Sequence, residues 1–166
     1  MSTSRTRCRF CSSELSQGFV DLGSSPLCQK HIPLSKANEA ESFYPLHALV
    51  CTECYLVQLG EFVVPAEIFG DGEYAYFSSY SDTWVNHARS YAELMTQRFS
   101  LDSKSLVVEI ASNDGYLLQN FVQRGIPCLG VEPASNCAQE AQKRGVESWV
   151  VFFGKQTANN AIIPGE

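Results

Sequence analysis

The stretch VVEIASNDGYLL, residues 107–118, decides the fold of the second half of the chain. A short β-branched run leads into the turn residues SNDG, and a helical period that Gly125 ends follows them. Further along, apolar runs and helical segments keep alternating, which predicts parallel strands joined by helical crossovers, βαβαβ, and hence an α/β fold. The predicted strands are Leu106–Ala111, Cys128–Val131 and Trp149–Phe153, and the predicted helices between them are Tyr116–Arg124 and Ala134–Arg144.

The turn after the first predicted strand lies where a doubly wound fold binds its nucleotide cofactor. A dinucleotide site uses GxGxxG to approach a pyrophosphate, whereas this turn contains only Gly115. Asp114 stands at the start of the predicted helix, where a carboxylate disfavours a phosphate and favours a cation. S-adenosylmethionine carries a sulfonium and an ammonium and no phosphate, so the turn favours it over NAD.

Two further acids frame this turn. Glu109 lies within the first apolar strand, where an unpaired acid is costly to bury, and this favours a place in a cofactor pocket. Glu132 ends the second strand, where an acidic side chain accepts ribose hydroxyls. The alternatives stay open: Glu109 as a solitary buried acid, Asp114 as a simple helix cap, and Glu132 as a solvated strand end.

A helix is predicted before this region. Asp82 is expected to cap it, and it is expected to end near Phe99. Its apolar residues recur at helical spacing and predict one buried face. They are Trp84, Ala88, Tyr91 and Met95.

The seven cysteines include two CxxC pairs, and the chain shows no signal peptide, so reduced thiols are expected. The two pairs predict a closed tetrahedral zinc site with a structural role. Residues 12–50 separate them, but closure entropy grows only slowly with loop length. The predicted ligands are Cys8, Cys11, Cys51 and Cys54.

Other assignments of the cysteines remain open. Cys28 with His31, and His47, are competing ligands for a mixed site, and the two CxxC pairs could instead be redox dithiols. Arg5, Arg7 and Arg9 are placed to offset the charge of four thiolates and one zinc ion. The isolated cysteines, Cys128 and Cys137, are expected to be small buried hydrophobes.

Composition narrows the class of function. The 166 residues carry a formal net charge of −6, so nucleic acid is not expected as a partner. No apolar run approaches the roughly 18 residues that span a bilayer. We therefore expect a cytoplasmic protein without a membrane partner, while the sequence leaves the oligomeric state undetermined.

The sequence resembles the zinc-containing, S-adenosylmethionine-dependent C-methyltransferases that act on nucleotide-activated keto-deoxysugars. The matching segments are CRFC, DLGSSPL, CTECYLVQL, YAYFSSYSDTWVNHA, VVEIASNDGYLLQNFVQRGIPCLGVEPA and the FFG that ends the third predicted strand. The resemblance implies a zinc module at 1–62, a packing loop and helix at 63–103, and the first half of a Rossmann-like class I methyltransferase domain at 104–166. It also implies a nucleotide-sugar substrate.

The resemblance further implies a set of cofactor-binding residues. An aromatic and hydroxyl cluster before the cofactor domain is expected either to bind S-adenosylmethionine or simply to pack against it. The implied residues are Tyr76, Ser79, Glu109, Ala111, Asn113, Asp114, Gly115 and Glu132.

No catalytic base is assigned. The family carries its acid and base residues beyond the third strand, and His31, His47 and His87 stand in no matching context. We therefore expect the isolated chain to be inactive, and a half sheet to leave Leu106–Ile110 as an unpaired edge. The rival hypotheses are a non-catalytic zinc-stabilised binding module or gene remnant, a zinc-ribbon nucleic-acid binder, and an NAD-dependent oxidoreductase.

Overall fold

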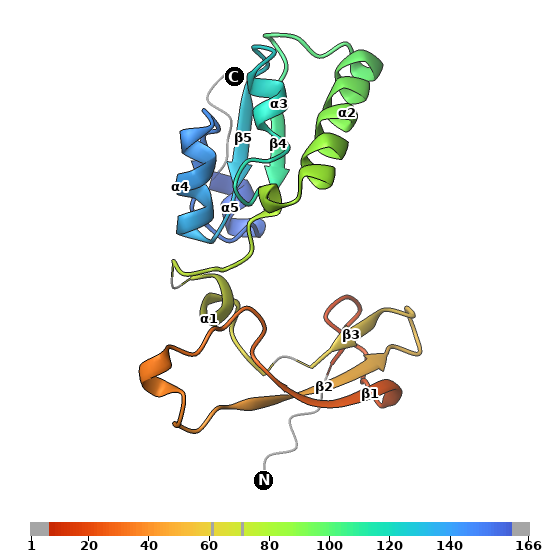
Figure 1. The fold of residues 1–166 in the computed structure, drawn as a ribbon. Helices are drawn as coiled ribbons and strands as arrows, with labels where there is room; N and C mark the ends of the chain where they lie inside the picture. The colour runs from red at the N-terminus through yellow and green to blue at the C-terminus, as the bar shows by residue number, and fades with distance from the viewer. Residues whose placement is uncertain (1–6, 61, 71, 161–166) are drawn as a thin grey trace. The chain divides into compact units, whose positions relative to one another are not determined.

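The computed structural model describes residues 7–60, 62–70 and 72–160, and the chain divides into two compact units (Figure 1). The first unit is Met1–Ile68 and the second is Phe69–Glu166. Arg5 and the last six residues of the predicted cofactor domain, 161–166, lie outside the described residues. In the described part of the chain, no helix is long and apolar enough to cross a bilayer.

The first unit is built on an antiparallel sheet in the order β1–β2–β3. β1 is irregular, with register shifts on both sides of Val20–Asp21, and most of its side chains are exposed. The strands are β1 (Gln17–Pro26), β2 (Phe43–Val50) and β3 (Val57–Leu59), accompanied by the 3-10 turn η1 (Leu34–Lys36) and by α1 (Pro65–Phe69), which spans the unit boundary.

The second unit contains a parallel sheet in the order β4–β5–β6, with a helix in each crossover. This confirms the predicted βαβαβ order, and β4 lies at the sheet edge in the described part of the chain. The elements are η2 (Ser78–Tyr80), α2 (Asp82–Phe99), β4 (Val107–Ile110), α3 (Gln119–Val122), β5 (Cys128–Val131), α4 (Ser135–Lys143), β6 (Ser148–Trp149) and α5 (Lys155–Asn160).

Two predicted elements are shorter than expected. The regular part of the helix after the turn is Gln119–Val122, because the Asn120 side chain donates to the carbonyls of Tyr116 and Leu117, which a regular first turn would engage with backbone N–H groups. The third strand ends at Trp149, where the N–H of Val151 bonds back to the Trp149 carbonyl and bends the chain.

Helix α2 ends at Phe99 as predicted, and its predicted apolar face is confirmed at the buried Ala88 and at Met95, which packs on the core, but its cap differs from the prediction. Ser81, and not Asp82, is the N-cap, and its Oγ accepts from the backbone N–H of Trp84 at 3.3 Å. The fully buried positions of the helix are Ala88 and Ala92, while the larger Trp84 remains partly exposed. Small residues therefore form the closest contact of α2 with the core.

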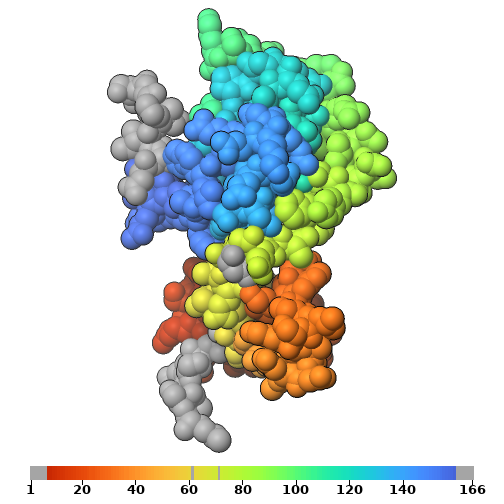
Figure 2. Space-filling model, turned by 60° about the vertical axis from the view of Figure 1, so that its left-hand side comes forward, coloured from red at the N-terminus to blue at the C-terminus, as the bar shows by residue number. Residues whose placement is uncertain are grey.

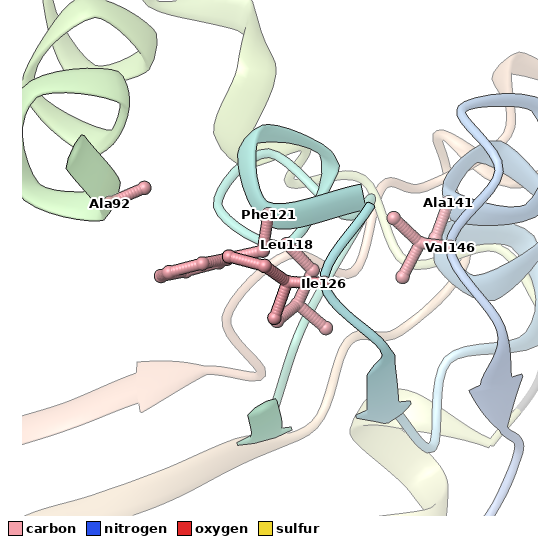
Figure 3. Close-up of a cluster of buried hydrophobic side chains, with 6 residues drawn as sticks. All are labelled: Ala92, Leu118, Phe121, Ile126, Ala141 and Val146. Carbon is pink, nitrogen blue, oxygen red and sulfur yellow. The ribbon is translucent and has the colours of Figure 1, made fainter. Parts of the chain in front are cut away.

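The core of the second unit is one apolar cluster that joins α2, α3 and α4 to the sheet (Figure 3). Val107 and Cys128, which pair across β4 and β5, pack against it. In the space-filling view the α3 region in cyan lies beside the α4 region in blue (Figure 2). The buried members of the cluster are Ala92, Leu118, Phe121, Ile126, Ala141 and Val146.

The two isolated cysteines behave as expected for small hydrophobes. Cys137 is fully buried and Cys128 half-buried. Burial raises the pKa of the Cys137 thiol to about 12 and that of the Cys128 thiol to about 11, so neither is a reactive thiolate.

Candidate functional site

The two CxxC segments of the first unit have the same backbone conformation. The N–H of Ser12 donates to the carbonyl of Cys8 at 2.9 Å, and the N–H of Tyr55 donates to that of Cys51 at 2.9 Å. Ser12 and Tyr55 also share a left-handed backbone, with φ of 64° and 61°. Each CxxC segment therefore forms a turn that directs its two sulfur atoms to one side.

The two turns bring four sulfur atoms together. The Sγ atoms of Cys8 and Cys54 lie 3.6 Å apart, those of Cys11 and Cys51 lie 3.5 Å apart, and all four lie within 4.8 Å of one another. A tetrahedral zinc ion bound by thiolates at about 2.3 Å separates its sulfurs by about 3.8 Å. The donor set and its spacing therefore fit a closed structural zinc site.

The electrostatics of the cluster favour a bound cation. The backbone N–H of Cys11 points to the Cys8 sulfur and, with the Gln58 amide, lowers the Cys8 pKa to about 6. A backbone N–H from Leu56 favours the Cys54 thiolate, but burial and the neighbouring sulfurs outweigh it and raise that pKa to about 12. Four thiolates cannot coexist here by themselves, and a divalent ion removes the conflict.

The alternative ligands lie outside this cluster. Among residues 7–60, 62–70 and 72–160, the only group able to hold a metal is the four cysteines. Cys28 is exposed, and His47 lies against Gly18 on β1. Two predicted neutralising residues hydrogen-bond carbonyls near the turns: Arg7 Nη1 donates to Ser12 and Arg9 Nη2 to Leu59.

In the second unit, the loop after β4 makes a tight turn with three left-handed residues. Ala111, Asn113 and Gly115 have φ of 59°, 50° and 75°. A Cβ on Gly115 would lie 3.1 Å from the side chains of Ala141 and Val146, so this glycine allows the loop to pack on α4. Non-glycine residues in this conformation are uncommon and cluster at functional sites.

The Asn113 side chain attaches the preceding segment to this loop. Its Oδ1 accepts from the N–H of Ser78 at 2.8 Å, and its Nδ2 donates to the carbonyl of Tyr76 at 3.1 Å. The side chain of Asn136 on α4 donates to the carbonyl of Tyr74 at 2.8 Å. The aromatic segment before α2 is thus fixed beside the loop by two asparagines.

Asp114 does not act as the free negative charge that the sequence analysis assumed. Its side chain is fully buried, its Oδ2 lies 3.0 Å from Nη1 of Arg144, and the same oxygen accepts from the N–H of Ser79 at 3.2 Å. Arg144 also donates to the Asp114 carbonyl and to Ser79 Oγ. Arg144 therefore offsets part of the Asp114 charge, and the selection of a cation over a phosphate by this turn stays a prediction.

Both carboxylate oxygens of Glu132 also accept hydrogen bonds. It is 4% exposed; its Oε2 accepts from the N–H of Asn113 at 2.9 Å and its Oε1 from the N–H of Ala134 at 2.8 Å. These bonds join the ends of β4 and β5. The alternative of a solvated strand end is therefore wrong for Glu132, which is a buried acid that fixes the loop.

Glu109 is one of two acids in this region with an unused side-chain oxygen, since the buried Oδ1 of Asp114 also has no hydrogen-bond partner among the described residues. The buried Oε2 of Glu109 has no partner among the described residues. Burial, followed by the charges of Glu132 and Asp114, raises its pKa to about 8. At neutral pH the carboxyl is mostly protonated, and a cation placed beside it would favour the charged form.

Exposed aromatic rings lie in the same unit. The ring of Trp84 stacks on that of Tyr116 at 5.9 Å and on that of His87 at 5.4 Å. Tyr76 is half-exposed, so its ring remains accessible. A flat ligand can stack on such rings, and His87 serves here as a stacking partner of Trp84.

Comparison with known proteins shows what the chain is similar to. Residues 8–69 match a family described as "Putative zinc binding domain". Over 141 residues, which are 85% of this chain, the sequence is 35% identical to the C-methyltransferase NovU of Streptomyces niveus. Over most of its own length the chain is thus similar to a C-methyltransferase. It covers 33% of the length of that relative.

The similarity to a C-methyltransferase agrees with the resemblance drawn from the sequence, and the matched zinc-binding region contains all four clustered cysteines. Two residues of the sites were not identified from the sequence. Arg144 was read only as the end of a helix, and Gln58 as part of a matching segment. Their partners lie 30 and 50 residues away along the chain, so no local pattern marks them.

Proposed function

We propose that this chain is part of an S-adenosylmethionine-dependent C-methyltransferase that acts on a nucleotide-activated keto-deoxysugar. The observation that carries the proposal is the 35% identity to a C-methyltransferase over 85% of the chain. The parallel βαβαβ sheet, with its tight loop after the first strand, supports a Rossmann-like cofactor domain.

The described side chains of the second unit offer a site for a cationic, partly flat cofactor. Glu109 would face the positive charge with its unpartnered oxygen, and the accessible ring of Tyr76 would contact the flat part of the molecule. When bound, S-adenosylmethionine supplies an electrophilic methyl group. Ala111, Asn113 and Gly115 would shape the loop around it.

The remaining predicted residues would act by holding that loop in place. Asp114 holds Ser79 through the Ser79 N–H, and Arg144 holds the Ser79 hydroxyl at 2.8 Å. Glu132 joins the loop to the second strand. In this proposal they are positioning residues rather than direct ligands of the cofactor.

The zinc site has no place for substrate, because four cysteines complete a tetrahedron. Its proposed role is to hold the first unit together. No residue of this chain is assigned as the base that removes the proton next to the sugar ketone, and we place that group in a part of the enzyme that corresponds to the remainder of the relative.

Methyl transfer tests the proposal. A protein that carries this chain with the segments matching the remainder of the relative is incubated with methyl-labelled S-adenosylmethionine and a keto-deoxysugar nucleotide. We expect label on a sugar carbon from that protein and none from residues 1–166 alone. Transfer by the short chain would show that the base has been misplaced. No transfer by the longer protein to any keto-sugar nucleotide would refute the proposed substrate class.

A further inference from the structure

Gln58 is a buried polar residue on an otherwise exposed strand. It is the middle residue of β3 and is 7% exposed, whereas its neighbours Val57 and Leu59 are 44% and 45% exposed. A short strand of this kind usually turns an apolar side chain inward. A buried amide costs free energy unless its groups are hydrogen-bonded, so its contacts decide its role.

Both ends of the Gln58 amide contact the first CxxC segment. Nε2 donates to the Sγ of Cys8 at 3.3 Å, and Oε1 accepts from the backbone N–H of Arg9 at 3.0 Å. Nε2 also lies 3.5 Å from the carbonyl of Leu56. The side chain is thus held at both ends, with one N–H directed at a candidate metal ligand.

Gln58 also connects segments that are distant in sequence. It follows Cys54 by four residues and reaches Cys8 and Arg9, while Arg9 in turn donates from Nη2 to the carbonyl of Leu59 at 2.7 Å. The two CxxC segments are separated by residues 12–50, so neither fixes the other through the chain. A contact from β3 to the first segment sets the distance between them.

We propose that Gln58 is a positioning residue of the zinc site, which donates an N–H···S hydrogen bond to Cys8 and fastens the first CxxC segment to the strand that follows the second. The bond stabilises the negative sulfur that binds the metal and fixes its direction. Groups that orient metal ligands in this way commonly change metal affinity by about 10- to 100-fold. The inference concerns zinc alone and is independent of the proposed methyl transfer.

Variants of the chain test this role. Gln58→Met removes the donor and the acceptor at similar size, and Gln58→Glu keeps the shape but places a carboxylate beside the thiolates. Gln17→Met is the matched control, because Gln17 lies in the same unit and its side chain donates to the carbonyl of the neighbouring Gly18. The measurement is the rate of zinc release to a chromogenic chelator. We expect roughly 10- to 100-fold faster release from Gln58→Met, a larger effect from Gln58→Glu, and no change from Gln17→Met.

A second measurement needs no variant and therefore holds even if a Gln58 variant fails to fold. The chain is loaded with cadmium-113 in place of zinc, and scalar coupling between the metal and amide protons is recorded through the sulfur atoms. We expect a cross peak from the Gln58 side-chain amide. Absence of that peak while backbone amides of the CxxC turns show theirs would overturn the proposal, and so would release rates from both Gln58 variants within twofold of the unmodified chain.

Discussion

The two units of the chain differ in the residues that form their buried clusters. The buried cluster of the first unit consists of Cys8, Leu15 and Cys51, so two of its three members are candidate zinc ligands. The second unit buries a six-residue apolar cluster contributed by three helices and the segments beside them, packed on the sheet. The first unit therefore has almost no core apart from its sulfur atoms, whereas the second has a core of its own.

This contrast separates two sources of stability. A small unit with few buried apolar side chains depends on metal binding for its folding, since the ligands are brought together only in the folded state. The second unit depends on apolar burial. It also contains the Asp114–Arg144 ion pair, which should stabilise it, and the half-buried Glu109, whose charged form should destabilise it. Each contribution can be removed separately.

The largest expected effect is that of zinc removal. Structural zinc binding amounts to about 10–16 kcal/mol in small zinc domains, so a strong chelator should unfold β1–β3 and leave the second unit folded. Both tryptophans, Trp84 and Trp149, lie in the second unit, so their fluorescence should not change. Hydrogen exchange of peptides from β1–β3 provides the other signal. If the chelator changed the tryptophan fluorescence together with the exchange protection of β1–β3, or changed neither, the two units would not have separate sources of stability.

The next effect concerns the buried ion pair. Arg144→Met leaves the Asp114 carboxylate buried without its cation, which should lower the free energy of unfolding by about 3–5 kcal/mol. Lys143→Met is the control on the same helix, because Lys143 forms an exposed pair with Glu140 that is worth about 0–1 kcal/mol. Urea denaturation followed by tryptophan fluorescence measures both. Equal decreases in the free energy of unfolding would show that the Asp114–Arg144 pair stabilises the unit no more than an exposed pair does.

The half-buried Glu109 carboxyl should lower the free energy of unfolding where it is charged. The pKa of Glu109 is raised to about 8 in the folded chain, so the folded state binds more protons than the unfolded state between about pH 4.5 and pH 8, and stability from this group falls as pH rises through that window. At pH 7 the penalty reaches about 3 kcal/mol. Glu109→Gln should therefore stabilise the second unit at pH 8 and not at pH 4.5. The exposed Glu93→Gln serves as control; the same pH profile for both variants would contradict the burial of Glu109.

The smallest effect tests the start of α2. Ser81→Ala removes the side chain that caps the Trp84 N–H and should cost about 1 kcal/mol. Asp82→Ala, at the position that the sequence favoured, should cost less, because Asp82 contributes only a charge near the helix start. Thermal unfolding compares the stability of the two variants. A larger decrease in melting temperature for Asp82→Ala would favour Asp82 as the cap, as the sequence predicted.

The sequence predicted what depends on local pattern. The alternation of apolar runs and helical periods placed β4, β5 and α4 within one or two residues, and the CxxC spacing identified the four cysteines that the structure brings together. These features follow from side-chain period and from ligand type. The third strand was predicted to be too long. The apolar residues Val150–Phe153 match a strand in composition, but the chain bends after Trp149.

Contacts that depend on tertiary structure were not predictable from the sequence. The sequence placed Asp114 in the turn but did not indicate that Arg144, just after α4, pairs with it. It placed Glu132 at the strand end but did not indicate that its two oxygens accept from the backbone N–H groups of Asn113 and Ala134. A residue type at a strand end shows that an acid is there, but only its neighbours in space show whether its charge is available to a ligand.

Calorimetric titration of the zinc-loaded chain with S-adenosylmethionine, with NADH as comparator, tests the central claim most directly. We expect S-adenosylmethionine to bind at pH 7 with a heat that varies with the ionisation enthalpy of the buffer, because Glu109 should release its proton when the cation arrives, and we expect NADH to give no binding heat. Binding of NADH by a chain that ignores S-adenosylmethionine would contradict the account.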